Sequence, residues 1–198
     1  MIRLLGLAAA MVVLALGAPA EAHTGAHAAG MAGGLGAGFA HPLFGLDHLL
    51  AMISVGALGA VIGGAALWAL PATFMGVMVA GGLLALAGIG LPGVELGIAA
   101  SLVVFGALLA ARIGMPVMLS VAIVGVFALF HGHAHGNEVP AMASPAAYVV
   151  GFVAATGLLH LAGIGLARGF QRLPRFCDLS VRVAGGAIAA CGLVLILG

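Results

Sequence analysis

Long hydrophobic runs separated by short breaks make up most of this chain. After residue 38 the runs recur at about 20 residues, the length that an α-helix needs to cross a bilayer. We predict six transmembrane helices, over residues 39–62, 66–87, 94–111, 113–130, 146–167 and 183–198. The runs are continuous and do not alternate with polar positions, which excludes a transmembrane β-barrel. The predicted fold class is therefore an all-α membrane protein, with residues 39–198 as its transmembrane domain.

The first 22 residues have the pattern of a secretory signal peptide. Arg3 provides the positive charge, residues 4–16 form the apolar region, and Ala20 and Ala22 are the small residues of a cleavage motif. We predict cleavage after Ala22; cleavage after Ala20 and an uncleaved signal anchor are the alternatives. Residues 23–38 contain Gly, Ala and His without periodicity, and we expect a flexible tail outside the cytoplasm.

The arginines predict an orientation for these helices. Arg112 follows the third predicted helix, and Arg168, Arg172, Arg175 and Arg182 lie between the fifth and the sixth. Cytoplasmic loops carry an excess of positive charge, so the N- and C-termini of the mature protein are expected in the periplasm. The expected location is the inner membrane of a bacterium.

The composition excludes several classes of protein. Hydrophobic residues make up 64% of the chain and charged residues 6%, whereas soluble domains carry about a quarter charged residues. A net charge of +1 provides no basic surface for nucleic acid. The two cysteines form no CxxC pair, so no thiolate metal site is predicted. There is no Walker A, HExxH or GxSxG motif.

Three polar residues interrupt the start of the first predicted helix. His41, Asp47 and His48 would be costly in a membrane without a function, and imidazole nitrogens suit Ni, Co, Cu and Zn. His41 and His48 share a face of an ideal helix, whereas Asp47 points elsewhere. A distorted helix start or ligands from other helices must therefore complete a metal site, and Pro42 is expected to keep His41 outside the regular turns. The alternative is that His41 caps the helix and Asp47 bonds to a neighbouring helix.

A second cluster follows the fourth predicted helix. His131, His133, His135 and Glu138 lie in the segment 131–144, which we expect to be polar and irregular. His-rich tracts of this kind commonly bind metal, and the alternative is a solvated loop. If the helix continues, His131 and His135 share a face and His133 is offset.

Four other polar residues are candidates at single positions. Glu95 begins the third predicted helix, where it is either a ligand or a carboxylate favoured by the helix dipole. His160 lies about 15 residues into the fifth helix and is either an inner station for an ion or proton, or a hydrogen-bonded core histidine. His23 and His27 are expected to collect ions, unless the tail is merely disordered.

These motifs resemble the HupE/UreJ family of nickel and cobalt permeases. The resemblance is carried by HPLFGLDH at 41–48, PGVELGIA at 92–99, FHGHAHGNE at 130–138 and LLHLAG at 158–163. It implies a secondary transporter that takes up Ni²⁺ or Co²⁺ through a His/Asp/Glu site in the outer half of the membrane. The larger nickel–cobalt transporter family has H-x4-D-H where this chain has H-x5-D-H, so ligand geometry from that family is not carried over.

The expected partners are the metal ion and the bilayer, with a periplasmic metal donor or a cytoplasmic metallochaperone as further candidates. Cu²⁺ and Zn²⁺ also suit these ligands, because Cu²⁺ binds nitrogen and oxygen donors more tightly than Ni²⁺ or Co²⁺ does. Two other functions combine Asp and His on bundled helices. One is an intramembrane zinc hydrolase with an activated water, and the other is a metal sensor or receptor without transport.

Overall fold

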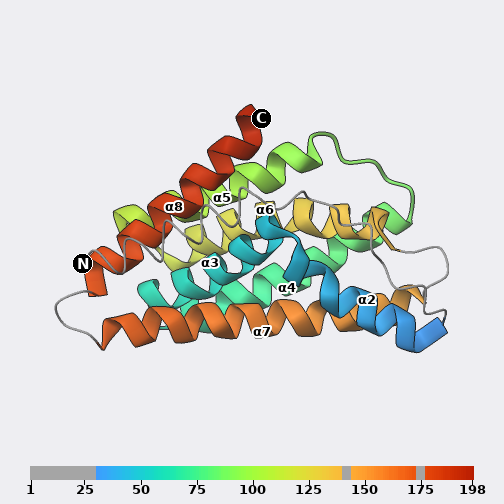
Figure 1. Ribbon diagram of the computed structural model, residues 1–198, viewed down its shortest axis with the longest axis horizontal. Coiled ribbons are helices and arrows are strands. Elements are labelled where there is room, and N and C mark those ends of the chain that lie inside the picture. Colours follow the sequence, from blue (N-terminus) through green and yellow to red (C-terminus); the bar gives the residue numbers. More distant parts are fainter. Residues whose placement is uncertain (1–29, 140–143, 173–176) are drawn as a thin grey trace.

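The computed structural model describes residues 30–139, 144–172 and 177–198, which form a bundle of helices (Figure 1). The described helices are α2 (Gly30–Phe44), α3 (Leu46–Ile62), α4 (Ala66–Leu86), α5 (Val94–Ala111), α6 (Val117–Asn137), α7 (Pro145–Gln171) and α8 (Cys177–Leu197). The predicted signal peptide and the candidate ligands His23 and His27 lie outside the described residues.

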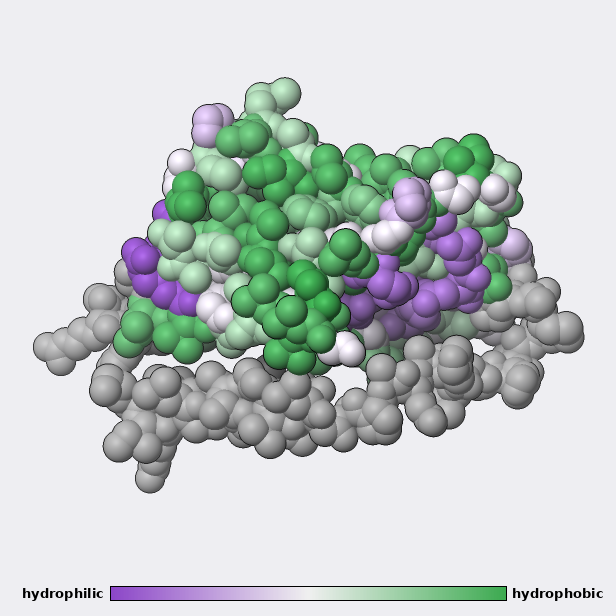
Figure 2. Space-filling model, turned by 90° about the horizontal axis from the view of Figure 1, so that it is seen from above, coloured by the Kyte–Doolittle hydropathy of each residue, from purple (hydrophilic) through white to green (hydrophobic). Residues whose placement is uncertain are grey.

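The predicted all-α membrane fold is confirmed within these residues. Five helices are long and apolar enough to cross a membrane, and a sixth span is formed if α2 and α3 are counted together. Figure 2 shows hydrophobic side chains across the middle of one face and hydrophilic ones towards its two ends, as expected for a protein surrounded by lipid. The periplasmic location of the termini stays a prediction.

The first predicted helix is interrupted, so its prediction as one continuous helix was wrong. It begins at Gly30, within the segment predicted as a tail, and stops at Phe44. Gly45 has an extended backbone, and α3 then leaves at an angle of 81° to α2. Glycine is a poor helix former, which favours an interruption at Gly45. His41 lies within α2, contrary to the expectation that it precedes the regular turns.

The helix α6, which corresponds to the fourth predicted helix, ends later than predicted. Pro116 is its N-cap, so α6 starts at Val117 rather than at residue 113, because proline suits the position before or at the first turn. The helix then continues to Asn137 and includes most of the segment predicted to be irregular. This extension places the second histidine cluster on a helix.

Glycines bring the helices close together around the centre of the bundle. In Figure 1, α7 lies along one edge of the bundle beside α2, and α5 and α8 lie along the opposite edge. A Cβ atom at Gly132 of α6 would overlap the carbonyl of Met78 on α4, and one at Gly56 of α3 would overlap the carbonyl of His160 on α7. Small residues that allow this approach are the usual means of packing helices in lipid.

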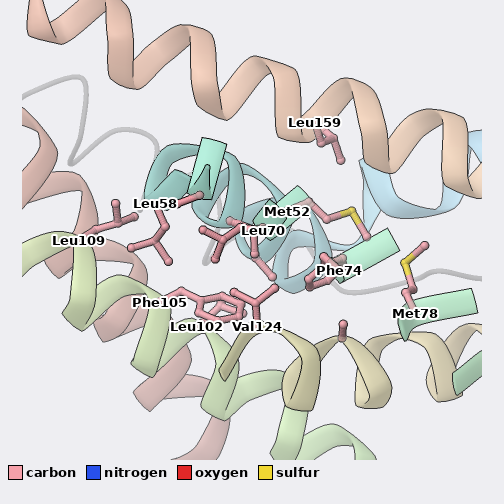
Figure 3. Packing of buried hydrophobic residues seen from close by; sticks show 14 of the residues in the cluster. Met52, Leu58, Leu70, Phe74, Met78, Leu102, Phe105, Leu109, Val124 and Leu159 are labelled. Carbon is pink, nitrogen blue, oxygen red and sulfur yellow. The ribbon is translucent and has the colours of Figure 1, made fainter. Parts of the chain in front are cut away.

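The apolar core lies in the layer between α7 and α6. Figure 3 shows Met52, Phe74 and Met78 in this layer, with Phe105 further along it. Phe74 and Met52 have no exposed surface. The core therefore separates the polar end of the bundle, where α6 ends, from the end that carries Arg168 of α7.

Replacing Gly132 with alanine is expected to destabilise the bundle, because α4 and α6 must separate to admit the new methyl group. Overpacking of this kind costs about 1–3 kcal/mol, which thermal unfolding in detergent followed by circular dichroism measures as a lower midpoint. Gly125→Ala on the same helix is the control, since its Cβ would make an ordinary contact with Thr73. Equal midpoints for the two variants would contradict the close approach.

Candidate metal site

Four histidine rings from three helices form a continuous chain at one end of the bundle. The ring of His41 on α2 lies 4.8 Å from that of His135 on α6, and His135 lies 4.2 Å from His48 on α3. His48 in turn lies 4.8 Å from His131, one turn earlier on α6. The structure therefore brings together the two motifs that the sequence places about 90 residues apart. His48, His131 and His135 are all buried.

Asp47 fixes the tautomer of His48. Its Oδ1 atom lies 2.7 Å from His48 Nδ1 and also accepts a hydrogen bond from the His48 backbone N–H. An ionised carboxylate only accepts hydrogen bonds, so Nδ1 carries the proton and Nε2 keeps its lone pair. Nε2 is buried and has no hydrogen-bond partner within the described part of the chain. A carboxylate behind a histidine in this way is the usual support of a metal ligand.

Ser101 of α5 does the same for His131. The Ser101 hydroxyl donates to the carbonyl of Ile98 at 2.6 Å, so its oxygen accepts the hydrogen bond from His131 Nε2 at 3.0 Å. The other ring nitrogen, Nδ1, then keeps a lone pair and meets no polar partner in the described ranges. Two histidines on different helices thus each hold a buried lone pair ready for a ligand.

His135, His41 and Glu138 form a group with metal-site dimensions. One ligand atom from each lies within 4.8 Å of the other two. The Glu138 Oε2 atom is 3.0 Å from His41 Nε2 and 3.5 Å from His135 Nδ1. Burial alone would raise the pKa of the Glu138 carboxyl, but its hydrogen bonds with His135 and His41 hold that pKa well below its usual range. The carboxylate is therefore ionised at neutral pH and offsets part of the charge of a cation.

His133 has a different environment from the other histidines of α6. Its Nε2 donates to the carbonyl of Ile89 at 2.8 Å, and its Nδ1 accepts from the side-chain amide of Asn137 at 3.3 Å. A neutral imidazole has one donor and one acceptor, and both are used here. These bonds tie α6 to the segment after α4 and leave no lone pair for a metal, so a structural role fits His133 better than the predicted ligand role.

His133→Gln is accordingly expected to keep metal binding and uptake close to those of the unmodified protein, because the glutamine amide can still donate to the Ile89 carbonyl. His131→Gln makes the same change two residues earlier on α6 and is expected to weaken both metal binding and uptake. Equilibrium dialysis of the purified variants against Ni²⁺ compares them directly. A loss in His133→Gln as large as that in His131→Gln would contradict the assignment.

Glu95 and His160 lie outside the chain of four rings. The exposed Glu95 shares with Asp47 the lining of an open cleft of about 300 Å³, together with Leu96, Ala99, Leu195 and Ile196. The role of Glu95 as a ligand stays a prediction. His160 is buried deeper along α7, where its ring meets Phe74 at a centroid distance of 5.3 Å.

Three residues of this site carry no signal in the sequence. Ser101 is an ordinary small polar residue, and its position opposite His131 depends on how α5 packs against α6. Tyr148 and Phe152 of α7 surround His41, at ring distances of 6.2 and 6.4 Å, and Phe152 also lies 3.9 Å from His135. These two aromatic rings cover the cluster on the side of α7.

Comparison with known proteins supports the resemblance noted in the sequence. Protein HupE of Rhizobium leguminosarum bv. viciae is 45% identical over 188 residues, which cover 95% of each chain. No solved structure matches the chain. The HupE / UreJ protein family matches residues 10–195, nearly the whole length. The chain therefore belongs to the HupE/UreJ family, a family of nickel and cobalt transporters with several membrane-spanning helices.

Proposed function

We propose that the protein takes up Ni²⁺ or Co²⁺ through a site made by His41, Asp47, His48, His131 and His135, with Glu138. The observation that carries this proposal is a set of three buried ring nitrogens that have no hydrogen-bond partner among the described residues, His48 Nε2, His131 Nδ1 and His135 Nε2. Leaving a buried polar atom unpaired costs about 1–3 kcal/mol, and three adjacent residues do so here. A divalent ion of borderline softness would satisfy them at once.

The two carboxylates complete the electrostatics of this site. Asp47 and Glu138 lie on opposite sides of the histidine chain, Asp47 beside His48 and Glu138 beside His41. Their two negative charges match the charge of one divalent cation. The neutral imidazoles then supply donor atoms without adding repulsion. Such a set favours a transition metal over Mg²⁺ or Ca²⁺, which prefer oxygen ligands.

Access to the site is proposed through the cleft between Asp47 and Glu95. This cleft is open to the surroundings, and Asp47 belongs both to it and to the histidine cluster. A hydrated cation attracted by the two carboxylates would exchange its waters for His48 and its neighbours. Glu95 then attracts the hydrated cation before the ligands bind it, which accounts for its exposed position beside α8.

The orientation predicted from the arginines makes uptake favourable without ATP. With the histidine cluster outside, an ion moving inward is driven by the membrane potential, at about 2.3 kcal/mol per charge per 100 mV and twice that for a divalent ion. The arginines at the ends of α5 and α7 lie at the opposite end of the bundle. This arrangement supports a secondary transporter.

Purified full-length protein in lipid vesicles tests the proposal. Vesicles with an inside-negative potential and an internal metal-sensitive dye should accumulate Ni²⁺ and Co²⁺ above protein-free vesicles. Binding of Ni²⁺ by the protein without accumulation in correctly oriented vesicles would contradict transport and favour a receptor. Cleavage of an added peptide by the zinc-loaded protein would instead favour the hydrolase.

Uptake is expected to fall as the pH drops below about 6, because a protonated imidazole has no lone pair to offer a metal. Affinity is full while the imidazoles are neutral and is lost as they take up protons. Glu138, whose pKa is lowered, stays ionised across this range and does not cause the loss. Initial Ni²⁺ uptake is measured with equal pH on both sides of the vesicle membrane. A rate that rises on acidification would contradict this expectation.

A further inference from the structure

His160 is the one described histidine with no polar contact at either ring nitrogen. Its side chain is 1% exposed, and both Nδ1 and Nε2 are buried without a hydrogen-bond partner among the residues that the structure describes. A neutral imidazole there has an unsatisfied donor and an unsatisfied acceptor. The predicted alternative, a core histidine bonded to a neighbour, is therefore not what the structure shows. An unpaired polar group at this depth requires a reason.

Phe74 of α4 contacts both His160 and the histidine cluster. Its ring centroid is 5.4 Å from that of His131 and 5.3 Å from that of His160. The ring is completely buried, so water and ions do not pass beside it in this conformation. A single aromatic side chain thus contacts both the histidine cluster and His160.

Two further metal donors lie one helical turn from Phe74 and His160, towards the end of the bundle that carries the histidine cluster. Thr156 is one turn before His160 on α7, and its hydroxyl points at the sulfur of Met78 on α4, with Oγ1 and Sδ 4.0 Å apart. Both residues are buried. A thioether is a weak hydrogen-bond acceptor, so this contact is easily exchanged for a stronger one. Imidazole, thioether and hydroxyl donors together suit a transition metal rather than a hard cation.

We infer that His160 forms a second, inner station for the metal ion, with Thr156 and Met78 as donors on the way from the outer cluster, and that the Phe74 side chain controls the passage to it. This inference rests on the proposed uptake function and adds the route that follows capture. An ion passes inward when Phe74 swings aside, and it exchanges His131 for His160 as ligand. The ring then closes behind it.

The inner station is expected to hold its ion only briefly. Asp47 and Glu138 belong to the outer cluster, and the residues named around His160 carry no charge. A divalent ion without a counter-charge is bound weakly in an apolar environment. Transport requires such weakness, since a site must release the ion as well as accept it. The two stations therefore differ in purpose, with tight capture outside and rapid transfer inside.

Variants at His160 separate the inner station from the outer site. The full-length protein in vesicles is compared as wild type, His160→Leu, His160→Met and His160→Cys, with His133→Gln as a buried-histidine control. Initial Ni²⁺ uptake over a range of concentrations gives the maximal rate and the half-saturating concentration. Equilibrium dialysis reports Ni²⁺ affinity, and thermal unfolding reports folding.

His160→Leu is expected to lower the maximal uptake rate at least about tenfold while half-saturation and equilibrium affinity change less than about twofold, the sign of a step after binding. His160→Met or His160→Cys should recover part of the rate, because each restores a donor atom. An unchanged rate in His160→Leu would overturn the inner station and leave the outer site intact. No recovery with either donor variant, at normal unfolding temperature, or an equal loss of affinity and rate in His160→Leu, would also overturn it. Absence of uptake in the wild type would overturn the proposed function itself.

Discussion

Replacing His135 with alanine is expected to reduce Ni²⁺ uptake to the level of protein-free vesicles. His135 is the central member of the histidine chain, because its ring lies 4.8 Å from His41 and 4.2 Å from His48. Its Nδ1 also lies 3.5 Å from the carboxylate of Glu138. Removing this one ring leaves the ligands of α2 and α3 joined only by the longer contact between His41 and His48, at 6.2 Å. The loss of this one ligand therefore affects both the group of His41 and Glu138 and the pair of His48 and His131.

The control for this variant is His133→Ala on the same helix. That change also removes a buried imidazole, but one whose nitrogens are occupied by the Ile89 carbonyl and the Asn137 amide. It is expected to lower the unfolding temperature more than the uptake rate per folded molecule. Uptake and Ni²⁺ affinity are measured on folded protein after gel filtration. Wild-type uptake by His135→Ala would contradict the site.

Asp47→Asn is expected to weaken Ni²⁺ binding about 10–100-fold, the range found when a carboxylate behind a metal-binding histidine is removed. The carboxylate of Asp47 accepts a hydrogen bond from the Nδ1–H of His48 and leaves Nε2 with its lone pair. An asparagine amide can donate to Nδ1 instead, which moves the proton to Nε2 and blocks the ligand. The variant is nearly isosteric, so the fold should be retained.

Isothermal titration of the purified variant with Ni²⁺ measures this effect, and Asp47→Glu provides the comparison that keeps the charge. The glutamate variant should retain more affinity than the asparagine variant, because its carboxylate can still accept a hydrogen bond from the imidazole N–H. If Asp47→Asn bound Ni²⁺ as tightly as the wild type, the tautomer argument for His48 would be wrong. If both variants lost binding equally, the position rather than the charge of the carboxylate would decide the affinity.

The hydrophobic pattern was sufficient to predict most of the fold. The bounds of α5 were predicted correctly, and those of α4 to within one residue, because Pro92 and Gly93 and the glycines at 63 and 64 interrupt long apolar runs. The errors occurred where polar residues lie on a helix. Residues 131–137 looked like a loop from their polarity, yet their histidines face the inside of the bundle and extend α6. Burial against other helices overrides the local pattern there.

The sequence was sufficient to predict which residues belong to the candidate site, but not how they are arranged. His48 and His131 were identified from their cost in a membrane, which depends on composition alone. Their separation, and the partners that fix their tautomers, depend on the crossing of α3, α5 and α6, which one sequence does not encode locally. The separate role of His133 depends on a carbonyl 44 residues earlier in the chain. Tertiary contacts of this kind have no periodic signature.

The break at Gly45 has a consequence for how the site changes shape. His41 belongs to α2 and His48 to α3, so a small rotation about this break changes their separation while His48, His131 and His135 keep theirs. Glu138 contacts His41 and would be drawn along or released by the same rotation. The number of ligands around a bound ion can thus differ between two positions of α2, depending on whether His41 and Glu138 reach the ion. The same break at Gly45 would then control both the dehydration of the metal ion and its release.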